Sequence, residues 1–442
     1  MKRGKPAALL PIGVFLVFYL GFGILFEYGM RIPMGFYNVP IVMAFLVAIL
    51  VACLQNRGVS FAEKLKIMGS GLGDPNIITM LLIFLTAGAF VGVVGRSGAQ
   101  SVAYFMLSVI PPKFAVAVLF VVACFVSTAM GTSVGTITLL VPIAVEVSLA
   151  SGFSLPLCVG TVIGGAMFGD NLSFISDTTI AACNGQGCAM QDKFRGNLRI
   201  ALPAALVSLA VILLRSASAV PQQITGSYDL LQILPYVLVL IGGIAGINVF
   251  VVLIGGIVSG SVILLLTGAT DFVSLLSSMG SGASQMFETS MVAVLVAAMC
   301  ALIRAYGGFD ALLYAVRRMF RGSRGGQLGI GLLVGVMDIA TANNTVAIVM
   351  ANPIAKEMSR DYGIGARRTA CLLDTFSCIF QGVIPYGAQM LVAISAVSEM
   401  GQSITAFEII PQLLYPAALL CSSLIAILLV PKKQEEEPEC RN

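Results

Sequence analysis

The chain has 442 residues, of which 58% are hydrophobic and 10% charged, and its mean hydropathy is +0.98. This apolar content exceeds that of a soluble domain and predicts an all-α polytopic membrane protein surrounded by the lipid bilayer. The net charge of +4 is scattered over short loops, so we expect no nucleic-acid partner. The absence of histidine excludes imidazole proton relays and every His-ligated metal site, and no cofactor or enzyme activity is expected.

Apolar runs predict about ten transmembrane helices in one integral membrane domain, residues 1–442. The run that follows MKRGK has no small-residue cleavage site, so we expect it to be retained as the first helix. The predicted spans are Leu9–Phe26, Val39–Leu54, Ile77–Gly95, Leu155–Cys183, Leu198–Leu214, Leu230–Gly246, Val249–Thr267, Thr289–Ala305, Arg367–Ala396 and Glu408–Val430.

Two apolar stretches are too long for one span. Lys113–Ala150 has 38 residues. As one helix it would be about 57 Å long, against a hydrocarbon core of about 30 Å. The polar sequence GTSVGT at 131–136 predicts a turn between two limbs of about 15 residues, which would form a re-entrant hairpin. Gln327–Met358 predicts a second hairpin around TANNT at 341–345.

The distribution of basic residues predicts the orientation in a cell inner (plasma) membrane. If the N-terminus is cytoplasmic and both hairpins return to the side they entered from, 21 of the 25 Lys and Arg lie on the cytoplasmic side. The loop Gly268–Glu288, which this topology places outside, has no basic residue. This asymmetry is what the positive-inside rule expects, so both termini are predicted to be cytoplasmic.

The sequence repeats at an offset of 211 residues. PIAVE at 142–146 matches PIAKE at 353–357, and an offset of 210 aligns Gly98 and Tyr104 with Gly308 and Tyr314. The third and eighth spans are separated by an odd number of spans, so the copies have opposite orientations. Inverted repeats with interrupted helices are typical of secondary transporters. We therefore predict a first inverted repeat at 77–216 and a second at 288–430.

The motif FGDNLSFISDTTI at 168–180 places Asp170 and Asp177 inside a predicted span. A charged side chain at mid-bilayer costs about 3 kcal/mol or more on an isolated helix, so a functional role is expected. We interpret the two aspartates as Na⁺ ligands that also bind protons, because burial at low dielectric lets a proton compete with a cation for a carboxylate. The alternative is a polar patch that joins helices.

Hard oxygen ligands for Na⁺ are available around this motif and at both hairpin turns. In the second repeat, Gln381 aligns with Asp170, and Asp374 is a third acidic candidate unless it pairs with Arg367 or Arg368. We interpret Asp338 as structural, and Glu146 and Glu357 as capping or salt-bridge residues. The neutral candidate ligands are Asn171, Ser173, Ser176, Thr132, Ser133, Asn343, Asn344 and Thr345.

The run GGAMFGDNLSFISDTTIAACNGQGC at 164–188, preceded by GTSVGTITLLVPIA at 131–144, resembles the NhaC-type Na⁺/H⁺ antiporters of the ion transporter superfamily. Their pattern reads approximately G-D-x-x-S-P-I-S-D-T-T. Phe174 stands where the family usually has proline. The matching residues are Asp170, Ser173, Ile175, Ser176, Asp177, Thr178 and Thr179.

The resemblance implies a secondary transporter that exchanges cytoplasmic Na⁺ for external protons. Relatives are thought to carry organic acids or amino acids, so the alternative is a Na⁺- or H⁺-coupled transporter of such a solute. A channel is disfavoured because Asp170 and Gln381 make the two halves chemically unequal. An aspartyl protease is disfavoured because its candidate residues, Asp74 and Asp229, lie on opposite sides in this topology. The sequence leaves a homodimer open.

Overall fold

The computed structural model describes residues 4–32, 38–173, 176–217, 227–245, 247–320 and 322–429, and all regular elements in these ranges are helices. The helices of the first half are α1 (Leu10–Leu16), α2 (Phe22–Ile24), α3 (Ile41–Leu54), α4 (Phe61–Leu72), α5 (Pro75–Val109), α6 (Ala115–Met130), α7 (Ser133–Ser151), α8 (Leu155–Leu172), α9 (Asp177–Gln186) and α10 (Met190–Ala217). Those of the second half are α11 (Leu230–Ile244), α12 (Val249–Leu266), α13 (Phe272–Gln285), α14 (Phe287–Ala305), α15 (Gly308–Met319), α16 (Gly322–Thr341), α17 (Asn344–Tyr362), α18 (Ala366–Val383), α19 (Ala388–Glu399), α20 (Ala406–Ile409) and α21 (Leu414–Leu428).

The described helices confirm a multi-pass membrane protein. Nine segments are long and apolar enough to span a bilayer, or ten if α20 and α21, which meet at an angle of 51°, count as one bent span. The predicted spans Ile77–Gly95 and Val249–Thr267 agree with the observed helices to within a residue. The first span is one run of helix, Pro6–Gly29, that contains two π-helical turns. Because apolar length decides spanning, these segments were the easiest part of the fold to predict.

The two halves follow the same succession of helices at a constant offset of 211 residues. The offset relates α7 to α17, α8 to α18, and the first residues of α9 and α19. Pro142 and Pro353 lie at equivalent places inside α7 and α17. Glycines with positive φ end both helices, Gly152 with φ 75° and Gly363 with φ 63°. The sequence match therefore extends to helix ends and caps.

Both hairpin turns have the same backbone. The first limb ends in a left-handed residue, Gly131 (φ 70°) after α6 and Ala342 (φ 49°) after α16. The next residue caps the second limb: the Thr132 side chain accepts the amide of Gly135, and the Asn343 side chain accepts the amide of Val346. Such caps satisfy amides that a helix N-terminus leaves free, which matters most where no water can do so.

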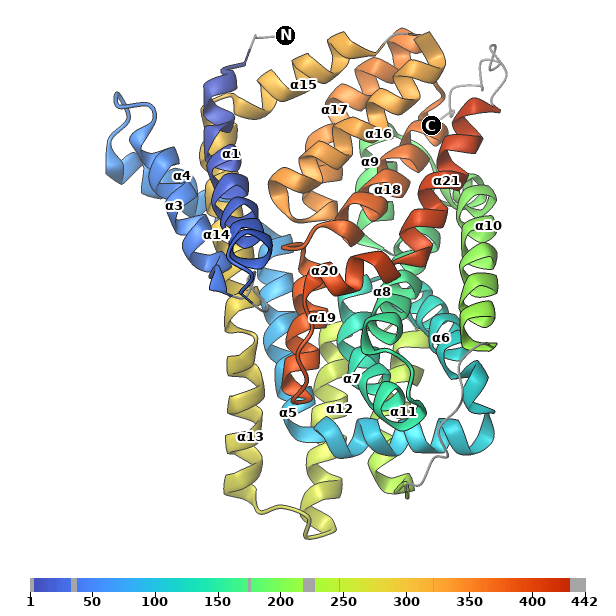
Figure 1. Cartoon of the computed structure of the whole chain (residues 1–442). Coiled ribbons are helices and arrows are strands. Elements are labelled where there is room, and N and C mark those ends of the chain that lie inside the picture. The colour runs from blue at the N-terminus through green and yellow to red at the C-terminus, as the bar shows by residue number, and fades with distance from the viewer. Residues whose placement is uncertain are drawn as a thin grey trace.

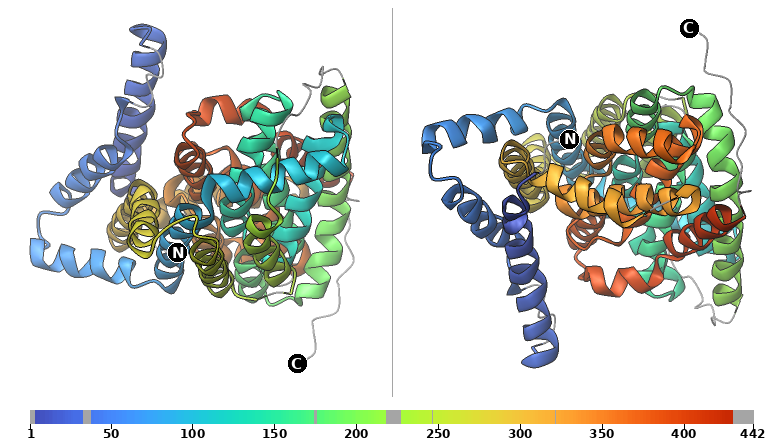
Figure 2. Two further views of the ribbon diagram at one scale, coloured as in Figure 1. Left: turned by 90° about the horizontal axis from the view of Figure 1, so that it is seen from below. Right: turned by 90° about the horizontal axis from the view of Figure 1, so that it is seen from above.

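The halves point in opposite directions. The part of α5 that follows its break at Gly95 lies across one end of the bundle, and α15 lies across the other end (Figure 1, Figure 2). These two segments contain the predicted pair Gly98/Tyr104 and Gly308/Tyr314. The α6–α7 hairpin enters from the α5 end and the α16–α17 hairpin from the α15 end (Figure 1). This arrangement agrees with the predicted inverted topology.

The hairpin limbs are longer than predicted. Helix α6 has 16 residues, α7 and α17 have 19 and α16 has 20, against the 15 expected for a limb. At 1.5 Å per residue a 19-residue limb is about 28 Å long, close to the bilayer core. The two turns nevertheless both reach the carboxylate of Asp170 inside the bundle. The extra length therefore extends the hairpins toward the two surfaces.

The centre of the molecule is formed by α7 and the α8–α9 span. Of the apolar windows of these segments, 89% and 94% are buried, against 33% for α12. Across the two halves, α9 packs on α17 and α19 packs on α7. Helices α1 to α4 project from the side of the bundle (Figure 2). The breaks between α8 and α9 and between α18 and α19 thus lie side by side in the most buried part of the protein.

Candidate cation site

Asp170 lies where the two hairpin turns meet the end of α8. Its side chain is 3% exposed. Carboxylate Oδ1 accepts the backbone amide of Ser133 at 3.1 Å, and Oδ2 accepts the side-chain amide of Asn344 at 3.5 Å. Ser133 and Asn344 are the first residues of α7 and α17, so the N-termini of both helices face this carboxylate. One acidic side chain therefore joins the two halves of the protein.

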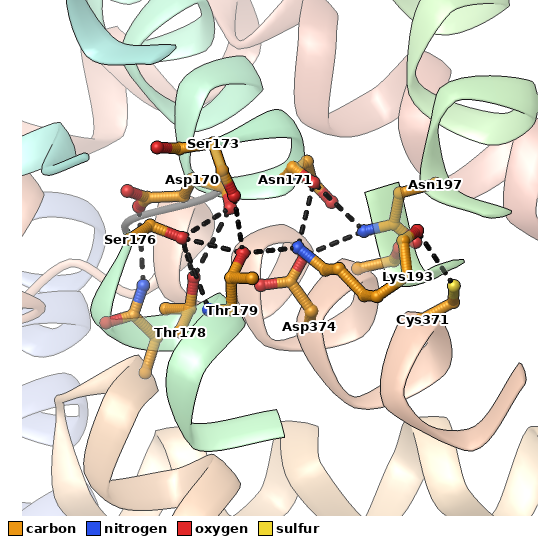
Figure 3. A network of polar contacts seen from close by, with 12 residues as sticks. Asp170, Asn171, Ser173, Ser176, Thr178, Thr179, Lys193, Asn197, Cys371 and Asp374 are labelled. Atoms are coloured by element: carbon orange, nitrogen blue, oxygen red, sulfur yellow. Dashed lines mark hydrogen bonds and ion pairs between the residues drawn. The ribbon is translucent and has the colours of Figure 1, made fainter. Parts of the chain in front are cut away.

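The break after α8 frees backbone carbonyls that hydroxyl groups then satisfy (Figure 3). Ser176 caps α9 by accepting the amide of Thr179, and its hydroxyl donates to the carbonyl of Asp170 at 3.1 Å. The Thr178 hydroxyl also donates to that carbonyl, at 3.3 Å, and the Thr179 hydroxyl donates to the carbonyl of Ser173 at 2.9 Å. Phe174 and Ile175 of the motif lie outside the described residues. The serines and threonines thus hold the ends of the break.

Asp177 occupies a different environment from Asp170. It is the first residue of α9, where a carboxylate is favoured by the helix dipole, and its side chain is exposed. Both aspartates line one cavity of about 60 Å³, together with residues of both hairpin turns. The predicted site residues on this cavity are Thr132, Ser133, Asp170, Asp177, Asn343, Asn344 and Thr345. Those behind its wall are Asn171, Ser173, Ser176, Asp374 and Gln381.

The second break contributes neutral amides in place of carboxylates. The Gln381 side chain donates to the carbonyl of Ala342 at 2.9 Å and to Oε1 of Gln389 at 2.8 Å. Gln389 in turn donates to the Ser133 hydroxyl at 3.1 Å. Gln381 is fully buried and fixes the second hairpin turn instead of facing the cavity. Gln389 was not predicted from the sequence, although it lies directly after the second break. The repeat offset of 211 residues relates it to Thr178, and this relation could have identified it.

A buried ion pair that the sequence did not predict supports the first break. Lys193 and Asp374 are both fully buried, and Nζ lies 2.7 Å from Oδ2. Lys193 also donates to the carbonyl of Asn171 at 2.9 Å and to the hydroxyl of Thr179 at 2.6 Å (Figure 3). Asn197, one turn later on α10, donates to Asp374 at 2.8 Å and to the same Asn171 carbonyl at 3.1 Å. Asp374 therefore pairs with Lys193 rather than with Arg367 or Arg368.

Asp338 is fully buried beside the second hairpin. The Ser377 hydroxyl is 3.4 Å from Oδ1 and also 3.4 Å from the carbonyl of Asn344, while Oδ2 has no hydrogen-bond partner among the described residues. This carboxylate lies behind the turn and does not line the cavity. The placement is compatible with the structural role that the sequence suggested.

Two further cavities lie between the site and one end of the bundle. A cavity of about 330 Å³ between α4 and α14 is lined by Asp74, Arg304 and Thr341, among others. A smaller cavity of about 20 Å³ shares Thr341 with it and Asn343 with the Asp170 cavity. Arg304 lies at the end of α14 that leads into α15. The chain of cavities therefore runs from Asp170 toward the α15 end.

The arrangement can bind a small cation. Asp170 supplies charge, while hydroxyl and amide groups from three elements supply neutral oxygens, which is the ligand type that hard cations prefer. An amide side chain such as that of Asn344 can present either its N–H or its C=O group, so it can serve the carboxylate when the site is empty and the cation when it is filled. Within the described residues, no group of three or more Cys, Asp or Glu is placed to hold a metal ion.

Comparisons with known proteins agree with this chemistry. Residues 37–217 match the sequence profile of the Na⁺/H⁺ antiporter family. The chain is 28% identical over 186 residues to the Na⁺/H⁺ antiporter NhaC of Bacillus subtilis, covering 40% of each chain. It is 26% identical over 201 residues to the malate-2H⁺/Na⁺-lactate antiporter of the same organism, covering 45% of this chain and 41% of the relative. These matches confirm the resemblance to NhaC-type Na⁺/H⁺ antiporters.

The matches are partial. The aligned region spans about two fifths of the length of these relatives. Among solved structures, the YdaH transporter of Alcanivorax borkumensis covers 96% of this chain and 98% of its own, with 14% identity and a TM-score of 0.43. At this score the structural likeness carries no argument about the fold, which rests on the helices described above.

Proposed function

We propose that the chain is a secondary active transporter that exchanges cytoplasmic Na⁺ for external protons at Asp170. The observation that carries the proposal is the position of this carboxylate, which is buried at the meeting point of both hairpin turns and the first break. A carboxylate in this setting binds either a proton or Na⁺, because both use the same oxygens. Asp177 provides a second negative charge on the same cavity.

Competition at one carboxylate is enough to couple the two ions. When Na⁺ occupies the site, Asp170 is ionised, and the cation compensates its charge. When Na⁺ leaves, a proton replaces it, since an uncompensated charge in a buried site is costly. If the protein changes between inward-open and outward-open states only when Na⁺ or a proton neutralises this carboxylate, the two ions are exchanged across the membrane.

The buried Lys193–Asp374 pair acts as a positioning group in this mechanism. Its ammonium and the Asn197 amide both hold the carbonyl of Asn171, the residue after Asp170. Lys193 contacts Asp374, Asn171 and Thr179, and removing either charge of the pair would leave the other one buried and uncompensated. The pair thus fixes the end of α8 and, through it, the direction of the Asp170 side chain.

The cavities support access from the α15 end. Of these three neighbouring cavities, the largest is lined by Arg304, near the surface helix α15, which the basic residues assign to the cytoplasm. The start of the described chain and the end of α21 lie at this same end (Figure 1). We therefore propose that both termini are cytoplasmic, that the protein lies in the plasma membrane and that the structure is open inward.

Everted membrane vesicles test the function. A respiration-generated pH gradient should be dissipated when Na⁺ is added to vesicles that contain the protein. Asp170→Asn should abolish this response and Asp177→Asn should reduce it strongly, at unchanged protein abundance. Glu357→Gln, which alters an exposed acid on α17, is the matched control and should exchange normally. Undiminished exchange in Asp170→Asn would refute the assignment.

A second candidate is a Na⁺- or H⁺-coupled carrier of a small organic acid. The cavity of about 330 Å³ exceeds what a single Na⁺ needs, and Arg304 offers a partner for a carboxylate. One relative bears a name that includes malate and lactate. Adding lactate, malate and amino acids to the same vesicle assay separates the two candidates, because only the second predicts that such a solute stimulates ion movement.

A further inference from the structure

A second group of buried acids lies at the end of the bundle opposite α15. It consists of Glu146 on α7, Tyr236 on α11 and Glu399 at the end of α19, and we call it the outer acid cluster. Helices α7 and α19 pack on each other, and the Tyr236 hydroxyl lies within electrostatic range of both glutamates. Glu146 is 4% exposed and Tyr236 is fully buried. The sequence had suggested only capping or a salt bridge for Glu146.

Polar atoms in this cluster lack the hydrogen bonds that burial demands. Both carboxylate oxygens of Glu399 are shielded from solvent and have no hydrogen-bond partner among the described residues, and the same is true of the Tyr236 hydroxyl. An ionised carboxylate without partners is expensive to bury, by several kcal/mol in proteins. A bound proton or a bound cation removes this cost. The cluster is therefore suited to hold a positive charge, which no side chain among the described residues supplies to Glu399 by a hydrogen bond.

Two helices connect this cluster directly to the cation site. Helix α7 begins at Ser133, whose amide binds Asp170, and reaches Glu146 about 20 Å further along. Helix α19 contains Gln389, which donates to the Ser133 hydroxyl, and ends at Glu399 about 15 Å further along. The two helices pack on each other. The elements that shape the site thus carry a glutamate at their far ends, on the side away from the cavities that lead to α15.

We propose that Glu399, together with Tyr236 and Glu146, is a second proton-binding site that passes protons between the outer face and Asp170. The direction of proton movement rests on the proposed exchange, whereas the binding of a proton by Glu399 does not. The Tyr236 hydroxyl, which makes no hydrogen bond in the described part of the chain, is the group that would donate to the Glu399 carboxylate once its proton leaves. This is a site for a proton or a small monovalent cation, distinct from the one at Asp170.

Titratable and charged groups on the neighbouring helices can also influence proton binding by Glu399. Helix α7 contributes Glu146, α11 contributes the Tyr236 hydroxyl, and α14 contributes Glu288 near its start. The outer part of α5 contains Arg96, and α13 has no charged residue. Glu288 is exposed, lies where α13 meets α14 and has no place in the proposed relay. It is therefore the matched control carboxylate.

Chemical labelling tests proton binding without any transport. Dicyclohexylcarbodiimide reacts with protonated carboxyls in apolar surroundings, and the adduct on Glu399 is located by mass spectrometry of the purified full-length protein in lipid. We expect labelling of Glu399 to rise as the pH is lowered from about 9 to about 5 and to show a shifted midpoint in Tyr236→Phe. No adduct on Glu399 across this range would overturn the proposal, as would a midpoint unchanged in Tyr236→Phe.

Transport by proteoliposomes tests the relay. Glu399→Gln should shift the dependence of Na⁺ exchange on outside pH to lower pH, because protons then reach Asp170 without the relay, while the half-saturating inside Na⁺ concentration stays within about twofold. Glu288→Gln should behave as wild type. A Glu399→Gln protein that keeps the wild-type dependence on outside pH would overturn the relay. If the wild-type protein itself shows no Na⁺ exchange, the proposed function fails, and the labelling result still decides whether Glu399 binds a proton.

Discussion

The two halves of the molecule share a backbone but not a chemistry. At a constant offset, both have a hairpin turn with a left-handed residue, a capped second limb and a broken helix. The first half places Asp170 and Asp177 at its break, whereas the second places Gln381 and Ala388 at the equivalent positions. The repeat thus provides two sets of free helix ends at the centre of the protein. Because charge occurs at only one break, we propose that the two sets form one cation site rather than two.

The largest predicted difference between the halves is the effect of substituting the equivalent residues Asp170 and Gln381. Asp170→Asn should abolish Na⁺-dependent proton movement, because the cation loses its buried charged ligand. Gln381→Ala should keep measurable exchange, since Gln381 holds the turn at Ala342 and does not line the cavity. Both variants are compared in the vesicle assay at equal protein abundance. Equal loss in the two variants would mean that the halves contribute equally.

The buried ion pair gives the next largest effect. Lys193→Met leaves Asp374 buried without its cation, which costs about 3 to 5 kcal/mol of stability. The double variant Lys193→Met/Asp374→Leu removes both charges and should recover most of the lost stability. Thermal unfolding of the detergent-solubilised protein measures this. A double variant as unstable as the single one would show that the hydrogen bonds, rather than the charges, stabilise the break.

Asn344 tests the neutral contribution of the second half. A buried hydrogen bond or neutral ligand is worth about 1 to 3 kcal/mol, so Asn344→Ala should raise the half-saturating Na⁺ concentration by about 5- to 150-fold. The maximal rate at saturating Na⁺ should fall much less, because Asp170 still supplies the charge. Rates measured over a range of Na⁺ concentrations separate the two effects. An unchanged Na⁺ dependence would remove Asn344 from the site.

The turns themselves provide the smallest effect. Gly131 and Ala342 hold equivalent left-handed positions, which cost a residue with a Cβ atom about 1 to 2 kcal/mol. Ala342→Gly should therefore stabilise the protein slightly, by about 1 kcal/mol or less, and Gly131→Ala should destabilise it by about 1 kcal/mol. Thermal unfolding of the two variants checks the opposite signs. A change in the same direction in both would show that the turns are not equivalent.

Local sequence patterns predicted the features that depend on residues close together in the chain. The spans follow from apolar length, and the turns and breaks follow from polar residues within apolar runs, so Asp170 and Asn344 could be identified from sequence. The surface helices after Gly95 and at α15 were not recognised, although Gly98 and Gly308 had marked the repeat there. Their amphipathic character was hidden beside longer apolar runs.

Long-range contacts explain what the sequence did not reveal. Lys193 lies near Arg195 and Arg199, so the positive-inside rule assigned it to a cytoplasmic loop. In the structure α10 begins at Met190, before the apolar run, and packs on α18. The lysine is buried because Asp374 approaches it from the other repeat. No pattern near Lys193 indicates that partner.

Sodium binding to the purified protein tests the central claim most directly. If a proton and Na⁺ compete for Asp170, the apparent Kd for Na⁺, measured by equilibrium binding of radioactive Na⁺, should rise by up to about tenfold for each unit that the pH is lowered below the midpoint of the competition. Asp170→Asn should bind no Na⁺ at any pH, while Glu357→Gln should match the wild type. A Kd that does not change with pH, or Na⁺ binding that survives in Asp170→Asn, would contradict the account.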